Sequence, residues 1–275
     1  MKLKNNYYIY TRYEKTGSKT LIKEIFSKYF HYHSLIINKK LFDKFIEDKE
    51  NNFLNETFII NIQIQRNIIK KNLINFDSKN YYDNILSFLK YIKKKYNLKI
   101  ILGIRAQKDI IESYYSQLAK NGYFISKKKF YKTHYKIWKY YEIIRNFYEI
   151  FSKENVHIFI LNNNLLDNEF KNLFFFLTNK KRVFKKIKKL NRRRSHNKVK
   201  LYMFFNFLRF RGANKFIKIS VLEKIIYIMS NILDKISHES NKNDYYKEYL
   251  SLYIDDNRKI EKNFKLNLRE RGFEL

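Results

Sequence analysis

The stretch Leu98–Gln117 reads LKIILGIRAQKDIIESYYSQ and joins two kinds of secondary structure without a gap. Its first seven residues, Leu98–Ile104 (LKIILGI), are aliphatic apart from one lysine and one glycine, which predicts a central β-strand buried on both faces. From Lys108 to Ala119 apolar residues recur at helical spacing. Because a strand passes directly into a helix, the stretch predicts one unit of an α/β fold.

Three further stretches have the composition of strands, and helical patterns alternate with them. The strand patterns are Tyr7–Arg12, Thr57–Gln63 (TFIINIQ) and Val156–Leu161 (VHIFIL). The helical patterns are Ser18–Phe30, Asn80–Tyr96, Tyr131–Phe151 and Leu165–Leu177. This alternation predicts an α/β fold with a parallel sheet flanked by helices.

The sequence after about Phe184 shows no further strand pattern. A basic, irregular segment, Lys185–Lys198 (KKIKKLNRRRSHNK), precedes two helical patterns at Lys215–Ile236 and Asp244–Phe264. We therefore predict a helical C-terminal part. The sequence contains no visible repeat, glycine-serine linker or domain boundary, so we expect residues 1–275 to form a single domain.

The composition supports a folded core and a cationic surface. Hydrophobic residues make up 45% of the chain, which is enough apolar surface for a core. The formal net charge of +32 favours contact with a polyanion such as nucleic acid, an anionic membrane surface, an acidic glycan or a phosphate-rich cofactor. Lys, Asn, Ile, Phe and Tyr have A/T-rich codons, and a solvated cationic surface inherited from codon usage explains the same charge.

Two absences limit the chemistry and the expected location. The chain has no cysteine, which excludes disulfides, thiolate metal sites and cysteine nucleophiles. The N-terminal stretch MKLKNNYYIYTR has no apolar signal core, and no run approaches the ~20 apolar residues that a membrane helix needs. We therefore expect a cytoplasmic protein.

The loop after the first predicted strand has the features of an anion site. In the stretch RYEKTGSKTL, which begins at Arg12, the strand meets a helix through hydroxyl residues, Gly17, Lys15 and Lys19. Backbone N–H groups at a helix N-terminus bind anions, and the two lysines add charge. The stretch is not a Walker A motif, because Ser18 separates Gly17 from Lys19 and the upstream glycine is missing. The alternative interpretation is a helix N-cap at Ser18 or at the preceding threonine, with exposed lysines.

A second strand end carries another candidate phosphate site. Arg105 closes the strand quoted first, and Ser113 follows eight residues later on the next helix. The motifs EKTGSKT and RAQKDIIES resemble those of the sulfotransferases that use 3'-phosphoadenosine 5'-phosphosulfate. In that family a Pro-Lys-Ser/Thr-Gly-Thr-Thr loop binds the 5'-phosphosulfate, and an Arg with a Ser eight residues on binds the 3'-phosphate.

The C-terminal stretch YIDDNRKIEKNFKLNLRERGF is similar to the closing segment of bacterial members. In those proteins an Asn-Arg pair precedes a leucine and a Gly-aromatic ending. The three motifs occur in the family's order and span nearly the whole chain. The resemblance implies a P-loop-like sheet and a cofactor site assembled from distant parts of the sequence.

The resemblance also implies residue roles, and it requires no metal. Lys15 would contact the bridging oxygen and the sulfuryl group, and Arg193 would contact the 3'-phosphate or adenine unless its basic segment is a plain cationic loop. The cofactor-binding candidates are Arg12, Lys15, Thr16, Gly17, Ser18, Lys19, Thr20, Arg105, Ser113 and Arg193.

A general base should deprotonate the acceptor hydroxyl. Bacterial relatives often have a carboxylate after the second predicted strand, but this chain has Gln63 there, and an amide cannot accept the proton. The substitutes are His33, which we take as the catalytic candidate, His31 in the same FHYHS stretch, and Glu56. The His-x-His pair has no further ligands nearby in sequence, so its metal signal is weak.

The resemblance therefore implies a sulfotransferase that acts on a glycan or glycolipid acceptor. One alternative is a basic protein that binds nucleic acid or another polyanion, for which the charge and the aromatic-lysine stretch KKKFYKTHYKIWKYY argue. No recognised nucleic-acid motif accompanies them, so we expect no specific nucleic-acid partner. The other alternative, suggested by Gln63, is an inactive relative that binds the nucleotide without transfer.

Overall fold

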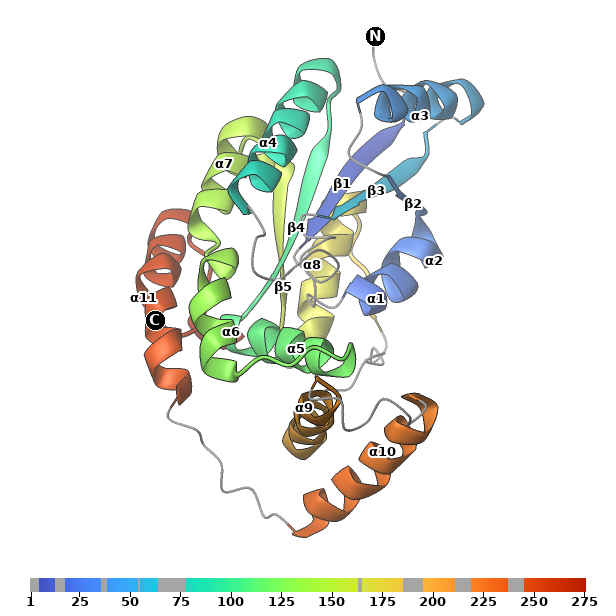
Figure 1. Ribbon diagram of the computed structural model, residues 1–275. Coiled ribbons are helices and arrows are strands. Elements are labelled where there is room, and N and C mark those ends of the chain that lie inside the picture. The colour runs from blue at the N-terminus through green and yellow to red at the C-terminus, as the bar shows by residue number, and fades with distance from the viewer. Residues whose placement is uncertain are drawn as a thin grey trace.

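The computed structural model describes residues 5–12, 18–35, 39–53, 55–63, 78–162, 165–184, 195–210, 219–236 and 245–275. These residues form an α/β fold in which helices flank a parallel sheet, as the alternating pattern predicts (Figure 1). The strand order is β2-β3-β1-β4-β5, and all four pairings are parallel.

Four strands lie where the sequence predicts them, and one was not expected. The strands are β1 (Asn6–Arg12), β2 (His31–Ser34), β3 (Thr57–Gln63), β4 (Lys99–Arg105) and β5 (Val156–Leu161). The bounds of β3 and β5 are the predicted ones, and those of β1 and β4 differ by one residue. The unexpected strand, β2, extends the sheet at the β3 side, where Ser34 is paired with Asn61.

The helices account for most of the remaining described chain. They are α1 (Ser18–Leu21), α2 (Ser27–Tyr29), α3 (Lys39–Asn52), α4 (Ser78–Lys95), α5 (Gln107–Lys120), α6 (Lys127–His134), α7 (Tyr141–Phe151), α8 (Leu166–Thr178), α9 (His196–Phe210), α10 (Ile219–Ile236) and α11 (Tyr245–Phe264). A π-helical turn, Ile22–Phe26, joins α1 to α2, and the short 3-10 helices are Tyr135–Trp138, Lys153–Asn155 and Arg269–Arg271. The predicted helix Ser18–Phe30 is therefore one continuous helical segment with a π turn inside it, and it ends at Tyr29.

The prediction of a single helix over Tyr131–Phe151 is wrong, because α6 and α7 are separate. Lys139 has an extended backbone between them. The carboxylate of Asp256 on α11 accepts hydrogen bonds from the backbone N–H groups of Tyr140 (2.7 Å) and Tyr141 (3.3 Å). These are N–H groups at the start of α7 that a continuous helix would pair internally. The break is therefore stabilised by a residue more than a hundred positions away.

The irregular segment predicted up to Lys198 also needs correction at its end. α9 begins at His196, and the Ser195 hydroxyl accepts a hydrogen bond from the Lys198 backbone N–H at 3.2 Å. A serine N-cap of this kind stabilises a helix start by about 1 kcal/mol. Residues 185–194 lie outside the described chain, and α3 was not expected from the sequence.

Both faces of the sheet are covered, and each cover has its own apolar cluster. Along β1, Tyr7 and Ile9 face the cluster that includes α3, α4 and α7, whereas Tyr8 and Tyr10 face the cluster that includes α1 and α8. Figure 1 shows these helices on opposite sides of the strands. Such two-sided burial explains why the central strands are apolar throughout their length.

Two helices extend from the body of the fold. α9 packs on α5, and α10 packs on α9 at the outer end of the molecule (Figure 1). The Asn206 amide anchors α9, because its Nδ2 donates to the backbone oxygens of Ala119 (2.8 Å) and Tyr123 (3.0 Å) at the end of α5. Among the described helices, none is both long and apolar enough to cross a bilayer.

Candidate functional site

The strand order identifies the end of the sheet at which a ligand would bind. β1 lies between β3 and β4, and the chain runs first to the β3 side and later to the β4 side. In open parallel sheets, ligands bind beyond the carboxyl ends of the strands at such a switch point. Arg12, the last residue of β1, is paired with Gln63 of β3 and with Gly103 of β4. We call the ends of these three strands, with the first turns of α1 and α5, the carboxyl edge.

The predicted loop between β1 and its helix falls largely outside the described residues. Lys15, Thr16 and Gly17 lie outside them, as do the side chains of Arg12 and Ser18. α1 begins at Ser18, so a helix does follow β1 at the carboxyl edge. Its next two residues differ in exposure: the Lys19 side chain is exposed, and Thr20 is buried at 8% relative accessibility.

Arg105 ends β4 at the carboxyl edge and is largely withdrawn from solvent. Its side chain is 15% exposed, and its Nη2 lies 3.4 Å from Oδ2 of Asp109, in the first turn of α5. The Arg105 carbonyl accepts a hydrogen bond from the Tyr140 hydroxyl at 3.0 Å. The strand end is therefore fixed through both its side chain and its backbone.

A pair of buried amides supports this strand end from α11. Gln107 Nε2 donates to Asn257 Oδ1 at 2.8 Å and to the Trp138 carbonyl at 3.3 Å. Asn257 Nδ2 donates to Gln107 Oε1 at 3.3 Å and to the Glu274 carbonyl at 2.8 Å. Gln107 and Asn257 are 2% and 0% exposed. These contacts tie the start of α5, two residues after Arg105, to the C-terminal segment.

Asp256 and Tyr140 complete this support. Burial raises the pKa of the Asp256 carboxyl above its usual value, although the N–H groups of Tyr140 and Tyr141 act in the opposite direction. Burial also raises the pKa of the Tyr140 hydroxyl, which therefore stays protonated and donates to Arg105. Sequence reasoning missed Asp256, Tyr140 and Gln107. Asp256 directly precedes the Asn-Arg pair of the C-terminal motif, and this position is the signal in the sequence that points to it.

The C-terminal motif lies beside the same strand end. Phe273, from the Gly-aromatic ending, is buried, and its ring centroid lies 6.4 Å from that of Tyr140. Gly272 has a φ of +80°, a left-handed backbone that favours glycine and turns the chain toward Phe273. Of the Asn-Arg pair, Asn257 is buried and Arg258 is exposed. The two distant motifs of the sequence therefore meet in space.

The carboxyl edge includes two buried side-chain oxygens that have no hydrogen-bond partner within the described chain. They are Oγ1 of Thr11, which is 1% exposed, and Oδ1 of Asn61, which is 2% exposed. The amide nitrogen of Asn61 is used, since it donates to the Ser34 hydroxyl at 3.3 Å. Unpartnered buried polar atoms are rare in folded proteins and call for a ligand or a water.

Ser113 is half-buried on α5, two turns beyond Arg105. Arg105, Asp109 and Ser113 follow at four-residue spacing, so they lie along one side of α5 and its approach. Arg193, the other candidate for the 3'-phosphate, lies outside the described residues. Its neighbour Ser195 uses its hydroxyl oxygen to cap α9.

The structure does not bring His33 to Arg105. His33 lies on the edge strand β2, three strand positions from β4, which corresponds to about 14 Å at the usual spacing. Its ring packs against Phe45 (centroids 5.0 Å apart) and Phe58 (6.0 Å), on the face of the sheet that α3 covers. Burial, Lys49 and His31 lower the pKa of His33, which favours the neutral ring.

The other two base candidates lie at the opposite end of the strands. His31 begins β2 and Glu56 precedes β3, and His31 Nε2 lies 3.4 Å from Glu56 Oε2. Both side chains are substantially exposed. The pair is therefore too remote to deprotonate a substrate held at the carboxyl edge. Among the described residues, no group of three His, Asp or Glu side chains is arranged to hold a metal.

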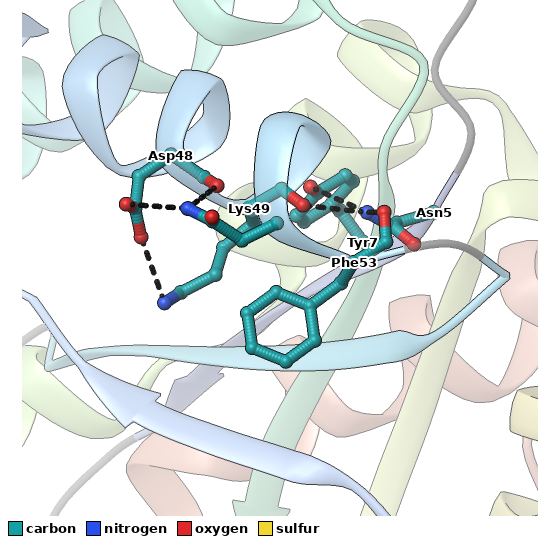
Figure 2. A network of polar contacts seen from close by, with 6 residues as sticks. Asn5, Tyr7, Asp48, Lys49 and Phe53 are labelled. Carbon is teal, nitrogen blue, oxygen red and sulfur yellow. Dashed lines mark hydrogen bonds and ion pairs between the residues drawn. The ribbon is translucent and has the colours of Figure 1, made fainter.

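This opposite end, which we call the amino edge, comprises the starts of β1, β2 and β3 with the C-terminal turn of α3. Asn5 organises it: its Nδ2 donates to the carbonyls of Lys49 and Phe53, both at 3.1 Å, and its Oδ1 accepts from the Glu56 N–H at 3.0 Å. Figure 2 shows the Asn5 amide directed toward Tyr7, Lys49 and Phe53. Here the polar groups satisfy one another.

Comparison with known proteins finds a distant similarity but no family to which the chain can be assigned. No family model matches this chain, and no solved structure matches it. Protein Ycf2 of Physcomitrium patens is 27% identical over 246 residues, which cover 80% of this chain and 10% of that protein. The chain thus spans about a tenth of the length of this curated relative. An identity of 27% within so small a share of the relative does not assign the chain to a family.

Proposed function

We propose that this protein is a sulfotransferase that moves a sulfuryl group from 3'-phosphoadenosine 5'-phosphosulfate to a hydroxyl of a glycan or glycolipid. The observation that carries the proposal is Arg105, a largely buried cation at the carboxyl end of β4, next to the switch point of the sheet. A buried guanidinium at a ligand-binding edge is well suited to a phosphate. The orphan oxygens of Thr11 and Asn61 lie near the same edge, on opposite faces of the sheet.

A P-loop-like sheet agrees with this proposal. Five residues separate the central strand β1 from α1, and neighbouring strands lie on both sides of β1. In the proposed complex, Arg105 and Ser113 bind the 3'-phosphate. Lys15 neutralises charge at the bridging oxygen, and the residues from Thr16 to Thr20 hold the 5'-phosphate. Arg12 and Arg193 are the further cofactor contacts that we propose.

For this reaction the protein mainly has to position the donor and the acceptor and to neutralise negative charge in the transition state. Sulfuryl transfer resembles phosphoryl transfer, in which a loose in-line transition state is stabilised by positioning and by preorganised cations. The donor supplies the sulfuryl group. The support from Gln107, Asn257 and Tyr140 keeps Arg105 in place before the donor arrives, so little reorganisation is needed on binding.

A second candidate function is nucleotide binding without transfer. His31, His33 and Glu56 all lie away from Arg105, and Gln63 stands where bacterial relatives often have a carboxylate. A chain that lacks a general base would bind the nucleotide but transfer the sulfuryl group slowly or not at all.

Calorimetry tests the cofactor site. We would titrate 3'-phosphoadenosine 5'-phosphate, with AMP as the control ligand, into the wild type, Arg105→Ala and Lys108→Ala at one fixed salt concentration. Lys108 is an exposed cation three residues away, so its removal matches the loss of charge. We expect Arg105→Ala to weaken the 3'-phosphate-dependent affinity by about thirtyfold, which corresponds to about 2 kcal/mol, and Lys108→Ala to change it little.

Equal and weak binding of both nucleotides, with the same response in both variants, would contradict the proposal and favour a general polyanion binder. Far-ultraviolet circular dichroism establishes that Arg105→Ala is folded. Transfer of labelled sulfate to a glycan acceptor is then measured separately. Tight nucleotide binding without transfer would identify the inactive relative.

A further inference from the structure

The helix α10 carries an unusual concentration of exposed apolar side chains. Thirteen large hydrophobic side chains are exposed in the described part of the chain, and six of them belong to this one helix. The six are Val221 (47%), Tyr227 (57%), Ile228 (59%), Met229 (40%), Ile232 (52%) and Leu233 (39%). Isolated exposed hydrophobics are normal, but a cluster on one element marks an interaction surface.

The exposed residues follow the helical repeat and form a stripe. Val221, Ile225, Ile228 and Ile232 are spaced by four, three and four residues, so they align along one face of α10. Ile225 is half-buried, and the other three are about half exposed. We call these four residues the α10 stripe.

The α10 stripe is not the face by which the helix is attached. Leu222, Ile226 and Ser230 are buried and lie on the side that packs toward α9. Asn206 in turn fixes α9 to the end of α5 through two hydrogen bonds. α10 is therefore already held by its own apolar contacts, and it lies at the outer end of the molecule (Figure 1), where Val221, Ile228 and Ile232 are about half exposed.

A lysine lies beside the stripe, and the segment that carries the stripe is basic. Lys224 is exposed and precedes Ile228 by four residues, which places it beside the stripe. Lys198 of α9 holds its Nζ 4.9 Å from the centre of the Tyr227 ring. The acidic Glu223 is partly neutralised, because Lys120 Nζ lies 3.8 Å from its Oε1. Over residues 196–236 the sequence has eight Lys or Arg and two Asp or Glu.

We propose that the α10 stripe docks on an anionic lipid surface, with α10 lying in the plane of the interface. Aliphatic side chains enter the boundary between headgroups and acyl chains, while surrounding lysines contact anionic headgroups. A nucleic acid fits the stripe poorly, because single strands are bound by aromatic stacking, and three of the four stripe residues are isoleucines. The inference does not depend on the sulfotransferase proposal, although it would place the protein beside a lipid-linked acceptor.

Vesicle flotation tests this docking directly. The full chain is mixed with vesicles of phosphatidylcholine alone or with a third phosphatidylserine, at one salt concentration near physiological ionic strength. We compare the wild type with Ile232→Asp and with Leu41→Asp. Leu41 lies on α3 at the far end of the molecule and is 53% exposed, against 52% for Ile232, so both variants add the same charge at similar exposure.

We expect the wild type to float with the anionic vesicles, Ile232→Asp to lower the partition coefficient about tenfold or more, and Leu41→Asp to leave it nearly unchanged. Equal losses in the two variants would mean that charge alone drives binding and would overturn the proposal. Sedimentation without lipid gives a second check. A dimer that Ile232→Asp dissociates would overturn the proposal in favour of a second copy of this chain. Neither readout involves the nucleotide, so failure here is distinct from failure of the cofactor site.

Discussion

The two ends of the sheet use buried polar groups differently. At the amino edge, Asn5 satisfies three backbone groups, and His31 pairs with Glu56. At the carboxyl edge, oxygens of Thr11 and Asn61 stay without partners in the described chain, and Arg105 is held by the buried Tyr140 at its carbonyl and by the partly exposed Asp109 at its side chain.

This difference distinguishes polar groups that stabilise the fold from polar groups that bind a ligand. A polar group that is paired within the fold stabilises it, whereas a buried orphan group lowers stability. Orphan atoms also occur elsewhere, at Nε2 of His134 and Nε1 of Trp138, so we infer a site only where orphan atoms lie near Arg105 and the switch point of the sheet. We therefore interpret the amino edge as a closure of the fold and the carboxyl edge as the site. Matched substitutions at the two edges test this interpretation. They should lower stability equally, but only the substitution at the carboxyl edge should weaken nucleotide binding.

The largest effect is expected from matched asparagine substitutions. Asn257→Ala leaves the Gln107 amide and the Glu274 carbonyl without their partner, and Asn5→Ala does the same to the carbonyls of Lys49 and Phe53. We expect each variant to lower the free energy of unfolding by about 3 kcal/mol, because buried groups lose hydrogen bonds and a cavity forms. Urea denaturation measures both values.

Nucleotide affinity distinguishes the two variants. Asn257→Ala should weaken binding of 3'-phosphoadenosine 5'-phosphate under conditions where it is folded, because Arg105 loses its support. Asn5→Ala should leave the affinity unchanged, since its contacts lie at the far end of the strands. Asn257→Gln should restore part of the affinity if positioning is the cause. A similar loss of affinity in both alanine variants would mean that stability alone explains it.

Much of the sheet could be predicted from sequence, because most of its strands have a recognisable local pattern of residues. Thr57–Gln63 and Val156–Leu161 are rich in β-branched and aromatic residues, and their observed bounds are the predicted ones. β2 was missed because HYHS is four residues long and has no aliphatic residue. The break between α6 and α7 was missed because neither Pro nor Gly marks it, and because Asp256 stabilises it from another helix.

The candidate site was predictable in part for the same reason. Arg105 and Ser113 follow from a local strand-to-helix pattern, and the structure places both at the carboxyl edge or on the helix that leaves it. The support of Arg105 by Gln107 and Asn257 joins residues 150 positions apart, which no local pattern encodes. His33 was selected for its chemistry alone, and chemistry does not reveal which edge or face a residue occupies.

The second prediction concerns acid and two histidines outside the two edges, of which His134 is buried and His157 is half-buried. His157 lies near the amino end of β5, stacked on Phe176, and His134 lies on α6 near the Trp138 segment that supports Gln107. Burial lowers the pKa of each imidazole to about 4. The unfolded chain binds these protons near pH 6.5, so the folded state loses stability as the pH falls from about 7 toward 4.

Between pH 7 and pH 5 each histidine should lower the free energy of unfolding by about 2 kcal/mol. Urea denaturation at the two pH values measures the loss. In His157→Gln and in His134→Gln the loss should shrink by that amount, since glutamine does not titrate. An unchanged pH dependence in either variant would show that its imidazole is already solvated in the folded state.

The smallest effect, and the one of opposite sign, is expected from Thr11→Val. Valine keeps the shape of threonine and removes the hydroxyl whose oxygen has no partner at the carboxyl edge. The folded state no longer desolvates an unpaired polar group, so the free energy of unfolding should rise by about 1 kcal/mol. Affinity for 3'-phosphoadenosine 5'-phosphate should fall in the same variant, because a stabilising substitution at a binding site removes a group that the ligand completes. A gain of stability with unchanged affinity would mean that the Thr11 hydroxyl is unpaired but has no role in binding. A loss of stability would mean that a water molecule already hydrogen-bonds to this hydroxyl. A rise in stability, measured by urea denaturation, together with a fall in affinity, measured by calorimetry, would support the contrast between the two edges. In that contrast, polar groups at the amino edge stabilise the fold, and polar groups at the carboxyl edge bind a ligand.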